Sequence, residues 1–126
     1  MLSWLPRATA VGAGLAFVLL GGWAMLGPTS FFESVARFDP YNQHFLQDIG
    51  AFQIGLGAVL LLAGVLAGAD ALATALVGAG VGAALHVVSH VVGADLGGNP
   101  ATDIPVFTAI AILVLAGGVI RWRSVR

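Results

Sequence analysis

Two histidines four residues apart lie inside an apolar stretch of the chain and are the first candidates for chemistry. A helix would place the imidazoles of His86 and His90 on one face, about 6 Å apart. Gly78 and Gly82 precede them at the same spacing of four. Small residues allow close helix contact, and histidines in a membrane hydrogen-bond or bind metals. We therefore expect this stripe to face protein and not lipid.

A second pair at the same spacing, His44 and Asp48, stands at the start of another apolar run. Imidazole and carboxylate groups from two facing helices can ligate one transition-metal ion at about 2.0–2.1 Å. His44, Asp48, His86 and His90 together are thus a candidate metal site, for which zinc, copper and non-haem iron are not distinguished. Alternatively, His44 and His86 ligate a haem in a four-helix bundle, or the histidines only hydrogen-bond between helices.

A polar residue also lies deeper in the second apolar run. Gln53 is about 140° around the helix from Asp48, so the two are not expected to serve one site. It shares a stripe with glycines at positions 50, 57, 64 and 68. We expect its side chain to hydrogen-bond a neighbouring helix or, alternatively, a ligand.

The composition places the chain in the class of integral membrane proteins. Of its 126 residues 59% are hydrophobic, against roughly 45–50% in soluble domains. Charged residues make up 9%, lysine is absent, and the formal net charge is −1. There is thus no basic face for nucleic acid, and the expected partner is the lipid bilayer. Because there is no cysteine, disulfides and thiolate metal sites are excluded. The lysine-free, Ala/Gly/Val-rich composition suggests a bacterial inner membrane.

Four apolar stretches match the roughly 20 residues that a transmembrane helix needs. We expect an all-α fold, a four-transmembrane-helix bundle with helices at about 8–27, 40–68, 71–92 and 103–120. Asp39 followed by Pro40 predicts the start of the second helix, Asp70 caps the third, and Thr102 or Asp103 caps the fourth. Between the first two spans, the spacing of Phe31, Val35 and Phe38 predicts a short amphipathic turn or helix on the membrane surface.

The distribution of arginine predicts the topology of this single integral membrane domain, residues 1–126. Arg7, Arg121, Arg123 and Arg126 are all near the termini. Four spans place both termini on one side, and the positive-inside rule makes that side cytoplasmic for the N and C termini. The first and third loops then face outward, together with the candidate site. Tryptophans near the expected span ends, at positions 4, 23 and 122, are interface anchors.

The second apolar run also carries a short motif, Gly50-x-x-Gln53-x-x-x-Gly57. It resembles the start of the second helix in the DoxX-like family of small four-helix bacterial membrane proteins. Gln53 stands where many members have glutamate, which would leave the position neutral. The resemblance implies a four-helix bundle, with links to membrane oxidoreductase complexes and quinone-linked sulfur oxidation.

Three functions are consistent with these patterns. The first is an accessory or ligand-binding subunit that assembles with other membrane-protein subunits or with itself. Its outward pocket, bounded by His44, Asp48, His86 and His90 and covered by the outer loops, would hold a small apolar or quinone-like molecule or a loop of a partner protein. The second is a metal-dependent enzyme using His86, His90 and Asp48 or His44, with Glu33 or Asp95 as acid or base. The third is a purely structural assembly subunit.

Overall fold

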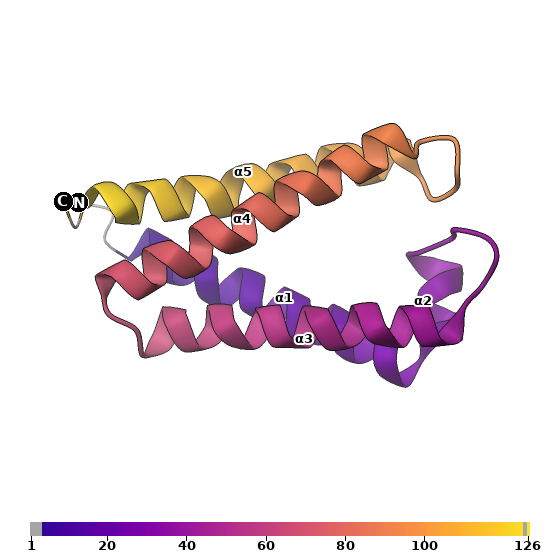
Figure 1. The fold of residues 1–126 in the computed structure, drawn as a ribbon, viewed down its shortest axis with the longest axis horizontal. Helices are drawn as coiled ribbons and strands as arrows, with labels where there is room; N and C mark the ends of the chain where they lie inside the picture. Colours follow the sequence, from indigo (N-terminus) through magenta and orange to yellow (C-terminus); the bar gives the residue numbers. More distant parts are fainter. Residues whose placement is uncertain (1–3, 125) are drawn as a thin grey trace.

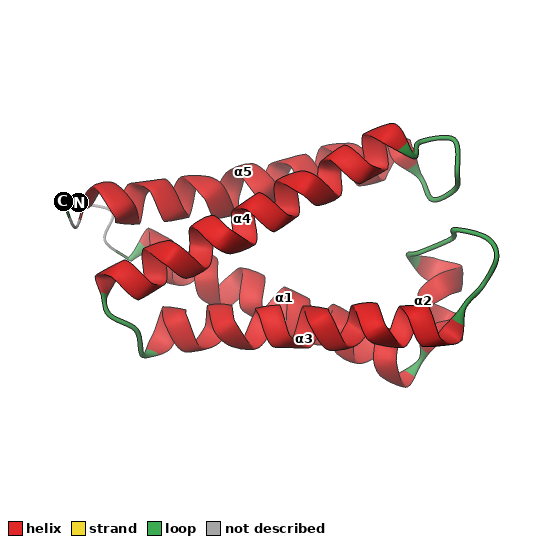
Figure 2. Ribbon diagram, in the orientation of Figure 1, coloured by secondary structure: helices red, strands yellow, loops and turns green. Residues whose placement is uncertain are grey.

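A computed structural model describes residues 4–124 and 126, and these residues form five helices and no strand (Figures 1 and 2). The helices are α1 (Leu5–Leu26), α2 (Pro28–Ser34), α3 (Gln43–Val65), α4 (Ala69–Val92) and α5 (Pro100–Ser124). The predicted all-α fold is confirmed. All except the short α2 are long and apolar enough to cross a membrane. The described chain therefore has four candidate spans, as the apolar stretches predicted.

The start of α3 differs from the prediction. The helix begins at Gln43, because the side chain of Asn42 accepts a hydrogen bond from the backbone N–H of Phe45 at 3.0 Å. This bond satisfies one of the free amides of the first turn, which is what an N-cap does. Asp39 and Pro40 lie before the helix and do not cap it.

The other helix ends also shift. Gly68 is the N-cap residue of α4, so Asp70 lies in the first turn and makes no capping hydrogen bond. Its charge there still interacts favourably with the helix dipole. In α5, which begins three residues earlier than predicted, Asp103 accepts a hydrogen bond from the backbone N–H of Asn99 at 2.8 Å. Of the three predicted aspartate caps, only Asp103 binds a backbone amide at a helix start.

Two antiparallel helix pairs make up the molecule, and glycines hold the first pair together. α1 packs mainly on α3. A Cβ built on Gly57 would lie 2.7 Å from the carbonyl oxygen of Gly14, and one on Gly50 would lie 2.6 Å from that of Gly21. These backbones approach so closely because none of the four residues has a side chain. Of the glycine stripe predicted on the second span, positions 50, 57 and 64 are thus helix contacts, whereas Gly68 lies beyond α3 and has nothing within 4 Å.

The second pair, α4 with α5, uses different glycines from those predicted. A Cβ on Gly80 would lie 2.6 Å from Cγ of Leu115, and one on Gly118 would lie 2.9 Å from the backbone nitrogen of Val77. Gly78 and Gly82 are exposed, and a Cβ on either would meet nothing within 4 Å. The prediction that this stripe packs against protein is wrong for the two glycines, because α4 turns its Gly80 side to α5, whereas the histidines of the stripe do contact Phe107.

The two pairs meet chiefly at the end of the molecule that carries both chain termini, which we call the terminal end (Figure 1). The core there joins all four long helices and consists of Ala10, Leu60, Ala63, Leu72, Leu76, Ala79 and Val114. Arg7 adds a polar link within the first pair, since its guanidinium donates to the carbonyl oxygens of Gly64 at 2.7 Å and Ala67 at 3.1 Å. The opposite end, with α2 and residues 93–99, is the loop end.

Toward the loop end the pairs diverge (Figure 1). No described residue of α4 beyond Gly80 is buried, and none of α5 before Ala111. Instead α1, α3 and α2 form a separate small core of Ala24, Phe31 and Leu46. A short helix thus lies between the first two spans, as expected, but it contains only Phe31 of the three residues that predicted it, since Val35 and Phe38 follow its end. The loop-end halves of α4 and α5 are left without a core against the other pair.

Candidate functional site

The inward faces of the four long helices change character along their length. One residue from each helix packs in the terminal-end core and is at most 3% exposed: Ala10, Leu60, Ala79 and Val114. Seven residues nearer the loop end, the same faces carry a second set, which we call the outer layer: Phe17, Gln53, His86 and Phe107. Seven residues are nearly two helical turns, so each outer-layer residue points within about 20° of its core counterpart and lies about 10 Å away.

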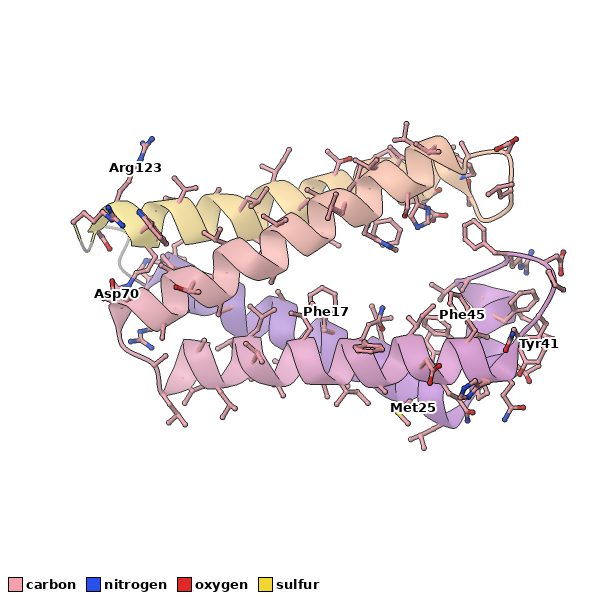
Figure 3. The ribbon with its side chains drawn as sticks, viewed as in Figure 1. Phe17, Met25, Tyr41, Phe45, Asp70 and Arg123 are labelled. Carbon is pink, nitrogen blue, oxygen red and sulfur yellow. The ribbon has the colours of Figure 1, made fainter. Side chains whose placement is uncertain are left out.

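None of the outer-layer residues is buried by the protein itself, although their counterparts are. Phe17, labelled in Figure 3, projects from α1 toward the other helix pair. The layer brings two aromatic rings and two hydrogen-bonding side chains to the place where the pairs separate. This place lies along four helices that are long and apolar enough to cross a membrane.

On the α4/α5 side three rings contact one another, two pairs edge to face and the His90–Phe107 pair tilted. The ring centroid of His86 is 4.7 Å from that of His90 and 4.7 Å from that of Phe107, and His90 is 4.8 Å from Phe107. These distances are typical of favourable aromatic contacts. The sequence prediction that the two histidines share one helix face is confirmed. Phe107 was not singled out as a site residue, although its spacing of seven from a buried valine could have indicated it.

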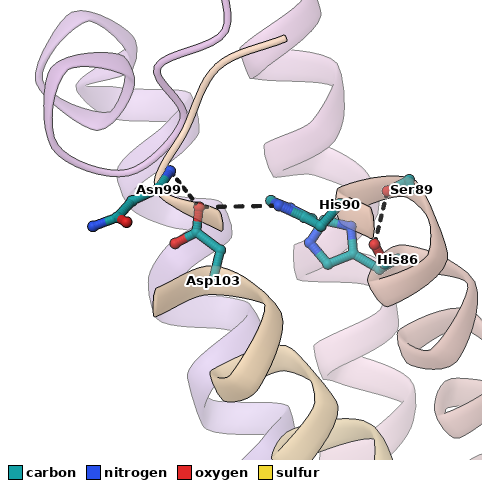
Figure 4. A network of polar contacts seen from close by, with 5 residues as sticks. All are labelled: His86, Ser89, His90, Asn99 and Asp103. Carbon is teal, nitrogen blue, oxygen red and sulfur yellow. Dashed lines mark hydrogen bonds and ion pairs between the residues drawn. The ribbon is translucent and has the colours of Figure 1, made fainter. Parts of the chain in front are cut away.

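Asp103 connects the rings to the loop at this end (Figure 4). Its Oδ2 lies 4.0 Å from Nδ1 of His90 and accepts the backbone N–H of Asn99. The side chains of His90 and Asp103 are 12% and 20% exposed, so the contact is largely shielded. Asp103, which the sequence predicts only as a helix cap, thus also lies beside His90 and would attract its protonated form.

The imidazole of His86 is different, because it makes no hydrogen bond to any residue that the structure describes. Only its backbone carbonyl is used, accepting from the Ser89 hydroxyl at 2.8 Å (Figure 4). Across the layer, Oε1 of Gln53 is buried and also lacks a hydrogen-bond partner among the described residues. An unpaired amide oxygen inside a membrane protein is unfavourable by roughly 1–3 kcal/mol. The exposed His86 imidazole is therefore free to bind a polar ligand, whereas Oε1 of Gln53 is enclosed and can do so only if its side chain turns.

The first and third loops meet over this region. The N–H of Gly98 donates to the carbonyl of Arg37 at 2.9 Å. Gly98 has a φ of 72°, a conformation that glycine adopts at low cost. The Phe38 ring lies 5.7 Å from the ring of His90. The loop contact covers the loop-end side of the histidines with a backbone hydrogen bond and an aromatic ring.

His44 and Asp48 are not part of this site. They lie about 160° and 120° around α3 from Leu60, away from the inward face. Their side chains are 86% and 56% exposed, and they pair with each other, Nε2 to Oδ2, at 3.5 Å. The expected pocket bounded by both His/Asp pairs is therefore not assembled.

The metal and haem hypotheses lose their geometric support for the same reason. Within residues 4–124 and 126, no three His, Cys, Asp or Glu side chains are grouped so as to hold a metal ion. A haem between His44 and His86 would need both imidazoles to face one space, and they do not. Glu33 and Asp95, the possible acid or base, are exposed in the outer loops.

Comparison of the chain with family models, with curated proteins and with solved structures found no match. The DoxX-like resemblance therefore stays a prediction from the motif around Gln53.

Proposed function

We propose that this protein is a multi-pass subunit of a bacterial inner membrane that binds a quinone-like head group between its two helix pairs. The observation that carries the proposal is the outer layer. The inward faces of the four long helices are buried in the terminal-end core. Seven residues nearer the loop end, where the pairs diverge, the same faces carry His86, Gln53 and two phenylalanines. Among the described residues, neither the imidazole of His86 nor Oε1 of Gln53 has a hydrogen-bond partner.

A quinone head group fits the chemistry of this layer. It is flat and apolar on its faces, which suits Phe17 and Phe107, and it carries oxygens on opposite edges. The N–H of His86 can donate to one oxygen. In the reduced form, a hydroxyl on the opposite edge can donate to Gln53 Oε1 once that side chain turns and exposes the atom, which is now buried. Ionisable and amide groups at this depth in a membrane protein are typical of ligand or proton pathways.

The wider assignment draws on the sequence. The resemblance to DoxX-like proteins favours an accessory role beside a membrane oxidoreductase, with other subunits or a second copy of this chain as partners. Imidazoles and an amide can bind and orient a quinone, but they carry no electrons. The electron-transfer step would therefore belong to the partner.

Titration of the purified protein in mild detergent with decylubiquinone and its reduced form tests the proposal. We expect His86→Leu to weaken binding of both forms about tenfold, the value of one hydrogen bond in a dry site. Gln53→Leu should weaken binding of the reduced form more than of the oxidised form, because only the former donates to Oε1. Isothermal titration calorimetry measures each affinity.

His44→Leu is the matched control, since this exposed histidine lies on the other side of α3. It should bind like the unmodified chain. If neither form binds the unmodified protein, or if the His44 and His86 variants are equally impaired, the proposed site is wrong. About one equivalent of a transition metal in elemental analysis, lost in His86→Leu, would replace it with the metal-dependent enzyme.

Orientation can be tested separately, because the chain has no cysteine. Both termini lie at one end, with four of the five arginines, and we propose that this end is cytoplasmic. In intact spheroplasts, Asp95→Cys should react with a membrane-impermeant maleimide and Arg123→Cys only after lysis. The reverse pattern would place the histidine site on the cytoplasmic side.

A further inference from the structure

The two ends of the molecule carry opposite charge. The terminal end has Arg7, Arg121, Arg123 and Arg126 with Asp70 as its one acidic side chain. The other five acids and Arg37 belong to the loop-end half. Arg7 is engaged by the carbonyls at the end of α3, so it is not available to a ligand. The remaining terminal-end charges lie where phospholipid head groups would surround four membrane-length helices.

A cavity of about 340 Å³ lies at this end, far along the helices from the histidines. It is lined by Asp70 and Thr74 from the start of α4 and by Trp122 and Arg126 from the end of the chain. The guanidinium of Arg126 sits over the Trp122 ring, 4.8 Å from its centroid. This cation–π contact holds the charge of Arg126 at the cavity wall.

The cavity holds one charge of each sign, and the two do not neutralise each other directly. Among the described residues, ion pairs within 4.0 Å join only His44 to Asp48 and His90 to Asp103. Asp70 and Arg126 line the same space without such a contact. The Thr74 hydroxyl donates to the backbone carbonyl of Asp70 at 2.8 Å, which leaves the Asp70 carboxylate free. A ligand that carries both a cation and an anion would complement both side chains.

We infer that this cavity binds the head group of phosphatidylethanolamine. The primary ammonium donates to the Asp70 carboxylate, and the phosphate oxygens accept from the Arg126 guanidinium, as charge-assisted hydrogen bonds. Trp122, which is 42% exposed, provides the amphipathic surface that tryptophan offers at this depth of a bilayer. Val119, one helical turn before Trp122 and 43% exposed, offers apolar surface for the acyl chains on a neighbouring part of α5.

Purely anionic lipids fit less well, because Asp70 would face their phosphate. Phosphatidylcholine has a cation but no N–H to donate, so it loses the hydrogen bond to the carboxylate. The site therefore predicts an order of affinity, with phosphatidylethanolamine above phosphatidylcholine and phosphatidylglycerol. This inference does not depend on the quinone proposal, since the two sites share no residue.

The test is a titration of the full-length protein in dodecylmaltoside with the dihexanoyl forms of the three lipids, followed by native mass spectrometry. We expect phosphatidylethanolamine to bind at least about fivefold more tightly than the other two. Asp70→Asn should remove that preference, and Arg126→Gln should weaken all three lipids. The matched controls are Asp95→Asn, at the loop end, and Arg123→Gln, whose side chain points away from the bundle (Figure 3).

Each other outcome overturns the inference. Tighter binding of phosphatidylglycerol, strengthened by Asp70→Asn, would mean that the arginines form a simple anion patch. Equal binding of soluble phosphoethanolamine, or displacement of the lipid by millimolar inorganic phosphate, would identify a soluble ligand. Unchanged affinities in both Asp70→Asn and Arg126→Gln, with both variants folded by circular dichroism, would place the lipid elsewhere.

Discussion

Replacing Gly57 with alanine is expected to destabilise the protein by about 2–3 kcal/mol, in the range for overpacking a tight contact. The new Cβ would lie 2.7 Å from the carbonyl oxygen of Gly14, 2.8 Å from Cγ2 of Val18 and 3.0 Å from its backbone nitrogen. Two of these atoms belong to the α1 backbone and cannot rotate away. The methyl group therefore has to push α1 from α3. Unfolding by SDS titration, followed by circular dichroism, measures the change.

Gly55→Ala on the same helix is the matched control. A Cβ at that position meets nothing within 4 Å, and the residue is exposed. Alanine is favoured over glycine inside a helix by about 1 kcal/mol, so this variant should be neutral or slightly more stable. Equal destabilisation by both substitutions would contradict the packing of α1 on α3 and point to a general effect on helix α3.

The second large effect is expected in the other helix pair. Gly80→Leu should cost about 3 kcal/mol or more, because even a Cβ there would lie 2.6 Å from Cγ and 3.1 Å from Cα of Leu115. A whole leucine side chain cannot be accommodated unless α4 and α5 separate. The same unfolding titration measures it, and the loss of the pair should also weaken quinone binding, since α4 and α5 carry His86 and Phe107.

Gly82→Leu, two residues along α4, is the control and should change stability by less than about 0.5 kcal/mol. Its position is exposed with open space around it. The stripe of four-residue spacing in the sequence predicts the reverse, with Gly82 as the sensitive glycine. A severe effect of Gly82→Leu with a mild one of Gly80→Leu would mean that α4 is rotated about its axis relative to the structure.

Much of the architecture can be predicted from residue types alone. Apolar runs of about 20 residues, separated by Gly, Asn, Pro and Asp, predicted the four long helices to within a few residues of most of their ends. A short helix before α3 was also predicted, although Val35 and Phe38, two of the three residues used for it, lie beyond its end. Helix starts were predicted less well. Asp39 and Asn42 are both good N-cap residues for α3, and Asp70 is one for α4, so only the fold decides which residue caps each helix.

The candidate site was predicted only in part. That His86 and His90 share a face follows from a spacing of four, which any α-helix converts into proximity. The same argument pairs His44 with Asp48, and that pair also forms. Spacing within one helix does not determine how that helix is rotated against its neighbours. Two correct pairs were therefore joined into one site that the fold does not build.

By itself, then, the sequence determined the number and length of the helices and the residues that share a face, because hydrocarbon thickness and helical periodicity act on each segment separately. Only the tertiary structure decided which faces meet. Lipid and protein interior are equally apolar, so the apolar pattern does not distinguish Gly80 from Gly82 or the inward face of α3 from the outward one. That choice depends on how closely two backbones can approach. The resulting rotation of the helices directs His44 and Asp48 outward and leaves His86 and Gln53 in one layer.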